Sequence, residues 1–163
     1  MSYTVIMSEK MQATVPVFLY LLDGQNRVYL QRRYKTGYLD GFYEPPAGKT
    51  NEGEFPPDAA CREALEEAGV VVEAQDLELF HSYMNLTDGK PWLGLMFRTR
   101  QWLGVPSIQE MDKCDHAGFF ALDSLPRLTP QVADGVGRIL TTASIEMITY
   151  DDIKHEYKAF PAP

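Results

Sequence analysis

Apolar runs and apolar–polar alternation along the chain predict five β-strands. These segments are rich in β-branched and aromatic residues, which favour strands, and they cover residues 14–22, 27–34, 77–84, 92–100 and 117–122. The turn sequence Asp-Gly-Gln-Asn separates the first two segments, so we expect these two strands to form a hairpin.

The segment before the first predicted helix, residues 35–49, holds prolines, glycines and aromatics. This composition is typical of an ordered loop without regular structure. A helix is expected over Pro56–Ala68, because proline suits the first turn and Gly69 tolerates the positive φ that ends a helix. Phe55 stands at the N-cap position and offers no side-chain acceptor there.

A second helix is expected after Thr129, which resembles an N-cap followed by proline at the first helical position. Apolar residues then recur at helical spacing and predict a stripe that packs on the sheet. The stripe consists of Val132, Val136, Ile139, Leu140 and Ala143. The elements together predict an α+β fold, a mixed sheet with helices packed on it.

Size and composition restrict the possible functions. A chain of 163 residues with 45% hydrophobic residues is expected to form one domain, residues 1–163. Its net charge of −8 disfavours stable nucleic-acid binding and anionic membranes. The two cysteines are too few for a disulfide framework, and no long apolar run predicts a membrane span. We therefore expect the protein to reside in the cytoplasm, with its cysteines reduced. For residues 2–13 the sequence leaves three interpretations open: an edge strand, a homodimer contact or an unstructured tail.

The most specific feature is residues 48–70, GKTNEGEFPPDAACREALEEAGV. Glycine, glutamate and arginine fall there at the spacing G-x5-E-x7-R-E-x-x-E-E-x-G, followed by an apolar residue. At ordinary composition this match arises by chance on the order of a few times per million chains of this length. The segment resembles the Nudix box, and the chain is similar to the Nudix hydrolase (MutT-like) superfamily. This resemblance implies an α/β/α sandwich and hydrolysis of nucleoside diphosphate derivatives with divalent cations.

Three box glutamates form the expected metal site. At about 100° per residue, Glu63, Glu66 and Glu67 share one arc of the helix, where their repulsion favours binding of a cation. Carboxylates suit Mg2+ or Mn2+. The resemblance implies that all three are metal ligands and that Gly48 turns the backbone sharply to present a carbonyl to the metal. The opposite side of the helix is expected to pack on the sheet through Ala60, Cys61, Ala64, Leu65 and Ala68.

The resemblance also implies catalytic roles for four residues. Glu54 is expected to support the metal site or position water, and Arg62 to pair with a carboxylate that joins the loop to the helix. Glu66 is expected to act in catalysis besides binding metal. Glu110, in a later loop, is the candidate base that takes a proton from water, with a solvated loop glutamate as the alternative.

Two segments outside the box narrow the subfamily. KTGYLDGFYEPPAGK and EMDKCDHAGFFALDSLP resemble stretches of bacterial Nudix proteins related to nucleoside triphosphatases. The implied reaction converts a small nucleotide, a nucleoside triphosphate in ordinary or oxidised form, to monophosphate and pyrophosphate. Lys49 and Met111 depart from that pattern, so the preference for base and sugar stays open.

Three residues outside the box are candidate substrate contacts. Arg32 and Arg33 follow the apolar run of the second predicted strand. At least one of them, but not both, is expected to face the pocket and contact phosphate, because adjacent strand residues point to opposite faces. Solvent exposure of both is the alternative. Tyr43, with Tyr38 and Phe42, is a candidate for stacking on a base; the alternative is that these rings fill the core of their own loop.

Other functions were weighed against a nucleoside triphosphatase. ADP-ribose, dinucleoside polyphosphates and coenzyme A are other Nudix substrates, but Asn85 stands where ADP-ribose hydrolases often have proline. A non-catalytic nucleotide sensor usually lacks box glutamates, which this chain keeps. A prenyl-diphosphate isomerase shares the fold, but it uses a catalytic cysteine and glutamate outside an intact box, and nothing in the chain suggests that arrangement.

Overall fold

The computed structural model of the protein describes residues 11–87, 89–140, 147–151 and 156–159. Among these residues six strands form a mixed sheet in the order β4-β1-β6-β5-β8-β9, and three form a smaller sheet in the order β3-β2-β7. The strands of the larger sheet are β1 (Pro16–Leu21), β4 (Ala47–Lys49), β5 (Glu78–Thr87), β6 (Lys90–Thr99), β8 (Met147–Asp151) and β9 (Glu156–Ala159). Those of the smaller sheet are β2 (Arg27–Arg33), β3 (Tyr43–Glu44) and β7 (Cys114–Ala121).

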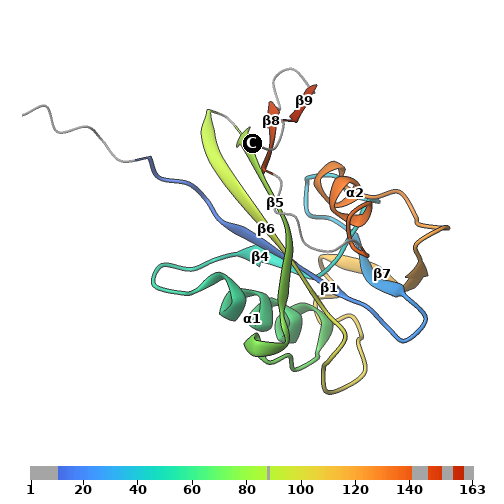
Figure 1. Ribbon diagram of the computed structural model, residues 1–163. Helices are drawn as coiled ribbons and strands as arrows, with labels where there is room; N and C mark the ends of the chain where they lie inside the picture. Colours follow the sequence, from blue (N-terminus) through green and yellow to red (C-terminus); the bar gives the residue numbers. More distant parts are fainter. Residues whose placement is uncertain (1–10, 88, 141–146, 152–155, 160–163) are drawn as a thin grey trace, which may run out of the picture.

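Two α-helices, α1 (Pro56–Ala68) and α2 (Pro130–Val136), lie on opposite sides of the larger sheet, and a 3-10 turn spans Ala74–Asp76 (Figure 1). This arrangement confirms the predicted α+β class. The strands predicted in residues 77–84, 92–100 and 117–122 are also confirmed as β5, β6 and β7, with β5 longer than expected.

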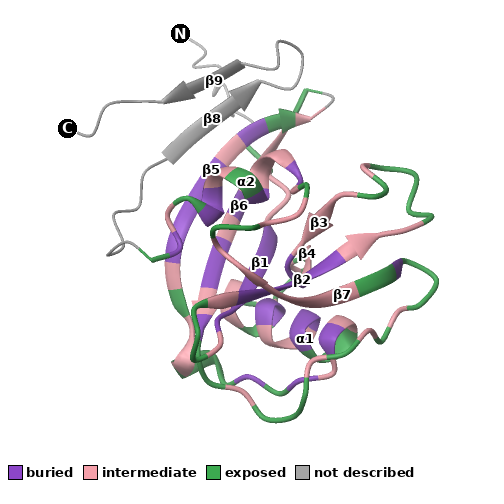
Figure 2. Cartoon of the chain, turned by 90° about the vertical axis from the view of Figure 1, so that its right-hand side faces the viewer, coloured by how far each residue is buried: buried purple, intermediate pink, exposed green. Residues whose placement is uncertain are grey.

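Strand β1 separates two hydrophobic cores. Because successive side chains of a strand alternate, Val17, Leu19 and Leu21 pack on the α1 side and the intervening residues pack on the α2 side. All six residues of β1 are buried, and each large apolar side chain buried in this way stabilises the fold by about 1.5–3 kcal/mol. Figure 2 shows the buried residues concentrated in β1, β6 and β5 and on the side of α1 that faces the strands.

The expected hairpin of the first two strands is wrong. β1 pairs with β4 and in parallel with β6, whereas β2 pairs with β3 and β7, so the two strands belong to different sheets. A tight turn does join them, since Asp23 accepts hydrogen bonds from the backbone of Gln25 and Arg27. Beyond the turn, the isolated bridge between Leu22 and Val28 is the link between the two strands. Their remaining backbone groups pair with other strands, β4 and β6 for β1 and β3 and β7 for β2.

Residues 35–49 are also more regular than expected. They contain the short strands β3 and β4, which add to the two different sheets. Between β2 and β3 the chain is a loop, in which Asp40 accepts hydrogen bonds from the backbone N–H groups of Thr36 and Gly37. This loop joins two strands of the smaller sheet, and the short connection from β3 to β4 then leads into the larger one.

Helix α1 spans the predicted residues, but its buried side lies closer to the box glutamates than expected. Phe55 gives no side-chain cap, and Gly69 ends the helix with φ of 68°, as predicted. However, Leu65 is 54% exposed and Cys61 is only half-buried, whereas Glu63 is buried together with Ala59. The predicted packing side is confirmed for Ala60, Ala64 and Ala68 and is wrong for Leu65, because the sequence does not reveal that strand β4 lies under Glu63.

Helix α2 is shorter than predicted. It ends at Val136, so Ile139 and Leu140 lie beyond it, and Ala143 falls outside the described residues. Thr129 precedes it in extended conformation but makes no side-chain cap hydrogen bond, contrary to expectation. Val132 and Val136 still bury the predicted apolar face.

Several other expectations bear on the described residues only in part. Residues 2–10 of the N-terminal segment fall outside them. Cys61 and Cys114 are not disulfide-bonded. In the part of the chain that the structure describes, no helix has the length and apolar character to cross a membrane.

Candidate active site

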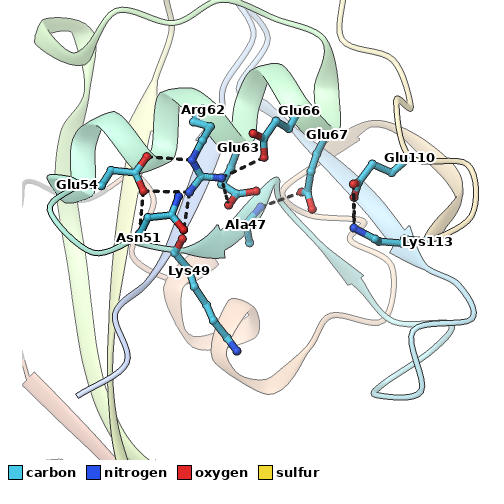
Figure 3. Close-up of polar contacts among 10 residues, drawn as sticks. All are labelled: Ala47, Lys49, Asn51, Glu54, Arg62, Glu63, Glu66, Glu67, Glu110 and Lys113. Carbon is cyan, nitrogen blue, oxygen red and sulfur yellow. Dashed lines mark hydrogen bonds and ion pairs between the residues drawn. The ribbon is translucent and has the colours of Figure 1, made fainter. Parts of the chain in front are cut away.

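Arg62, in the middle of α1, is the centre of a charged cluster (Figure 3). Its Nε and Nη2 donate to both carboxylate oxygens of Glu54, at 2.9 and 3.1 Å, and Nη2 also donates to the Lys49 carbonyl at 3.0 Å. Its Nη1 reaches Glu63 at 2.6 Å and Glu66 at 3.0 Å. One guanidinium thus joins strand β4, the loop after it and the helix.

These contacts lower the pKa of one partner and raise that of the other. Hydrogen bonding from Arg62 lowers the pKa of Glu54, which also accepts a hydrogen bond from the Asn51 amide at 2.8 Å. The same pairing raises the pKa of Arg62, so the guanidinium stays charged. Burial raises the pKa of Glu63 although Arg62 opposes the rise.

Gly48 leaves the space that the Glu63 carboxylate occupies. A Cβ built on Gly48 would lie 1.8 Å from Glu63 Oε1 and 2.1 Å from its Cδ, far inside contact distance. Gly48 lies within β4 and has no positive φ, so the sharp turn expected there is wrong. Glycine is required at this position by the close approach of a side chain, not by backbone conformation.

Glu67 is the most perturbed carboxyl of the box. Its Oε2 accepts a hydrogen bond from the Ala47 amide at 3.0 Å. Burial raises its pKa to about 8, with further contributions from the negative charges of Glu63, Glu44 and Glu110. Buried carboxylates that repel one another are stabilised by a nearby cation.

Glu110 lies across from Glu67 and is held by Lys113, whose Nζ donates to both its oxygens at 2.8 and 3.0 Å (Figure 3). Glu67, Glu110 and Lys113 line a cleft of about 190 Å³, which we call the carboxylate pocket. The structure therefore brings the candidate base near the end of the box helix.

A second cleft of about 370 Å³ adjoins the first, and we call it the aromatic pocket. Its aromatic lining comes from four parts of the chain and consists of Phe18, Tyr38, Tyr83 and Trp92. Lys49 places its Nζ 5.1 Å from the centre of the Trp92 ring. Arg33, Glu44 and Ala47 line both pockets and form the wall between them.

Of the three predicted substrate contacts, the two arginines border the carboxylate pocket and the tyrosine does not. Arg32 and Arg33 both border the carboxylate pocket, although only one was expected to, because the pairing of β2 with β7 shifts register between them. Arg32 forms a bidentate ion pair with Asp115 at 2.7 and 3.0 Å. Arg33 pairs with Glu44 and also donates to the carbonyl of Tyr38 at 2.7 Å.

Tyr43 lines neither pocket, so the structure does not bring it to the site. Its hydroxyl lies 3.0 Å from Nδ1 of His116, and its ring packs edge-on against Phe120 at 5.3 Å. Tyr43 thus packs against strand β7 and one of the two hydrophobic cores, and not within a core of its own loop as the alternative proposed. Tyr38, which is 57% exposed, is the loop aromatic that borders the aromatic pocket.

The sequence did not predict three polar residues of the pocket walls as parts of the site. Glu44 is one of them, and burial raises its pKa despite the ion pair with Arg33. Gln31 and Asn85 are the others, buried amides whose Nε2 and Oδ1, respectively, have no hydrogen-bond partner within the described residues. Each of these residues is a polar residue on a strand, and the sequence could have indicated a site only through that feature. Without the strand register, however, one cannot tell whether the side chain faces a pocket or solvent.

The carboxylates fit a divalent cation by their chemistry. Within the described residues no three acidic, histidine or cysteine side chains already converge tightly enough to enclose an ion. Their oxygens are engaged by Arg62 and by the Ala47 amide instead. Yet Glu63, Glu66 and Glu67 supply only hard oxygen donors, and burial raises the pKa of Glu63 and Glu67, a rise that a bound cation would oppose.

Comparisons with known proteins identify the family. The model of the NUDIX domain matches residues 12–140, most of the chain, so the protein belongs to the Nudix family. It is a hydrolase of pyrophosphate bonds, and members of this family act on small nucleotide substrates and generally use divalent metals. A search of curated proteins found no match.

Solved structures agree with the family. A MutT NUDIX hydrolase from Burkholderia pseudomallei is 27% identical, with a TM-score of 0.71 over 78% of this chain and 98% of its own. A Mutator MutT protein from Bacillus halodurans is 18% identical, with a TM-score of 0.70 over 92% of this chain and 99% of its own. The ORF135 protein from E. coli is 16% identical, with a TM-score of 0.69 over 80% and 90%. The last two likenesses show the fold alone.

Proposed function

We propose that the protein is a Mg2+-dependent pyrophosphohydrolase that cleaves a nucleoside triphosphate, ordinary or oxidised, to monophosphate and pyrophosphate. The observation that carries this proposal is the common wall of the two pockets, formed by Arg33, Glu44 and Ala47. A ligand with one flat ring and a chain of phosphates would place its ring among the aromatic side chains and its phosphates beside the carboxylates.

The metal would be held by Glu63, Glu66 and Glu67, with Gly48 leaving room for the first of them. Bound Mg2+ or Mn2+ lowers the pKa of water and offsets charge on the pyrophosphate oxygens. Arg62 orients two of these carboxylates and ties them to Glu54, whose half-buried carboxylate supports the site. The guanidinium acts by position, since its planar fork fixes several oxygens at once.

Glu110 is proposed as the group that accepts a proton from the attacking water. Its carboxylate borders the same pocket as Glu67, and Lys113 holds it in place. Lys113 and Arg33 also place positive charge where the phosphates of the substrate would lie, as does Arg32 at the edge of this pocket.

A hydrolysis screen with Mg2+ or Mn2+ tests the proposal. The panel contains ordinary and oxidised nucleoside triphosphates, ADP-ribose, diadenosine polyphosphates and coenzyme A, with products identified by mass. Monophosphate and pyrophosphate released from a triphosphate would support the proposal. A clear preference for another compound, or nucleotide binding without turnover of any, would reject it in favour of a different Nudix substrate or a sensor.

A further inference from the structure

A buried amide without a partner lines the aromatic pocket. Asn85 in β5 is 3% exposed, and within the described residues its Oδ1 has no hydrogen-bond partner. Its side chain nevertheless borders the cleft. A buried polar atom left unpaired destabilises a protein, and such atoms are rare in folded proteins. Asn85 is therefore better explained by a group that enters the pocket than by the stability of the strand.

The strand register places this amide between aromatic rings. Asn85 lies directly opposite Trp92 in the antiparallel pairing of β5 with β6, and Tyr83 precedes it by two residues on the same face. Tyr83 in turn lies 6.1 Å from Phe18, measured between ring centres. A flat ring that stacks on these side chains would turn its edge towards the amide.

The other polar groups of the pocket are already satisfied by other means. Glu44 is engaged by Arg33, and the Lys49 ammonium lies over Trp92. Gln131, which enters from α2, is only half-buried, so water can satisfy its amide. Among these four side chains, Asn85 is therefore the buried one whose polar atom, Oδ1, lacks a partner within the described residues.

We propose that Asn85 determines which ring the aromatic pocket accepts, by hydrogen bonding to the polar edge of a nucleobase. The inference rests on the proposed function, because it takes the ring of a nucleotide as the ligand of this pocket. A side-chain amide carries a donor and an acceptor side by side. It complements a base edge with an adjacent donor and acceptor, and a ring that lacks the exocyclic group leaves the amide unpaired.

The test measures binding of nucleoside 5′-monophosphates by calorimetry, which requires no turnover because these compounds hold no phosphoanhydride bond. Each monophosphate is paired with an analogue whose exocyclic amino or keto group is replaced by hydrogen. The Asn85→Leu variant, of similar size, is compared with Ser82→Ala, which removes a buried polar side chain elsewhere on the same strand.

The wild-type protein is expected to bind its preferred monophosphate about tenfold to hundredfold more tightly than the matching analogue, the cost of one unpaired buried group. Asn85→Leu should remove that preference, and Ser82→Ala should keep it. The thermal midpoint of Asn85→Leu should equal or exceed that of the wild type, because the substitution buries no unpaired amide.

Two results would overturn this role. The first is an unchanged preference in Asn85→Leu, and the second is a wild-type protein that binds no monophosphate. Asn85→Asp keeps an acceptor and loses the donor, so it provides a second variant should Asn85→Leu fail to fold. Failure of the proposed function would look different, since triphosphates would then resist hydrolysis while the monophosphates still bind with an Asn85-dependent preference.

Discussion

The charged cluster around Arg62 and the aromatic pocket come from the chain in different ways. The acidic side chains around Arg62 belong to one segment, residues 48–70, in which strand β4 runs into helix α1. The aromatic pocket takes residues from seven strands and helices, namely β1, β2, β3, β4, β5, β6 and α2, and from the loop after β2. The expected metal ligands are thus encoded locally, whereas the candidate base Glu110 and the lining of the aromatic pocket depend on how distant segments meet. Substitutions on the two sides should separate turnover from binding.

The largest effect is expected from Glu63→Gln on the carboxylate side. Loss of a metal ligand should lower kcat/KM by about two or more orders of magnitude, while the fold persists. Steady-state kinetics with circular dichroism checks this result. Glu52→Gln, in the exposed loop of the same segment, is the matched control and should behave as the wild type. Wild-type turnover by Glu63→Gln would refute the metal assignment.

Gly48→Ala should lower kcat by about tenfold or more, because the new Cβ would occupy the position of the Glu63 carboxylate. Gly118→Ala is the matched control, since Gly118 also lies in a strand but its Cβ would meet nothing within 4 Å. Kinetics and thermal melts on both variants make the comparison. Equal activity of the two would show that the Glu63 carboxylate can move away freely.

Trp92→Leu should affect the aromatic side alone. Loss of ring stacking should raise KM by about tenfold, since such stacking contributes about 1–3 kcal/mol per base, and kcat should change little. Trp102→Leu is the control, because Trp102 stacks on Phe119 at 6.2 Å and lines neither of the two pockets. A fall in kcat with unchanged KM would contradict the division between turnover and recognition.

The smallest effect is a dependence of stability on pH. The pKa of Glu67 is raised by burial from 4.5 to about 8, so between these values the folded protein binds a proton that the unfolded chain has released. The free energy of unfolding should therefore fall as pH rises through this window. Glu63 and Glu44, whose pKa values burial also raises, act in the same direction.

Thermal midpoints from pH 5 to pH 8.5 in a chelator should show this decline. Glu67→Gln should reduce the slope and raise the midpoint at pH 8, and added Mg2+ should oppose the decline in the wild type because metal binding displaces protons. An identical slope in Glu67→Gln would show that its carboxyl is not the group that titrates.

Local interactions explain which parts of the fold could be read from the sequence. The box helix begins at Pro56 and ends at Gly69 because a proline at the start and a glycine with positive φ act within one turn. Strands β5, β6 and β7 also follow from their own composition. Side-chain direction was less predictable, as Leu65 shows, because the neighbours of a helix come from elsewhere in the chain.

The sequence by itself determined the family, the box helix, and the carboxylates that fit a cation, because these depend on spacing within one segment. Only the tertiary structure decided that β1 and β2 part into different sheets, that Gly48 makes room for Glu63, and that Tyr43 packs away from both pockets. It also decided that Asn85 lies beside Trp92 with an Oδ1 that has no hydrogen-bond partner within the described residues. These outcomes depend on pairing between residues far apart in sequence, where burial selects among partners that local patterns cannot distinguish.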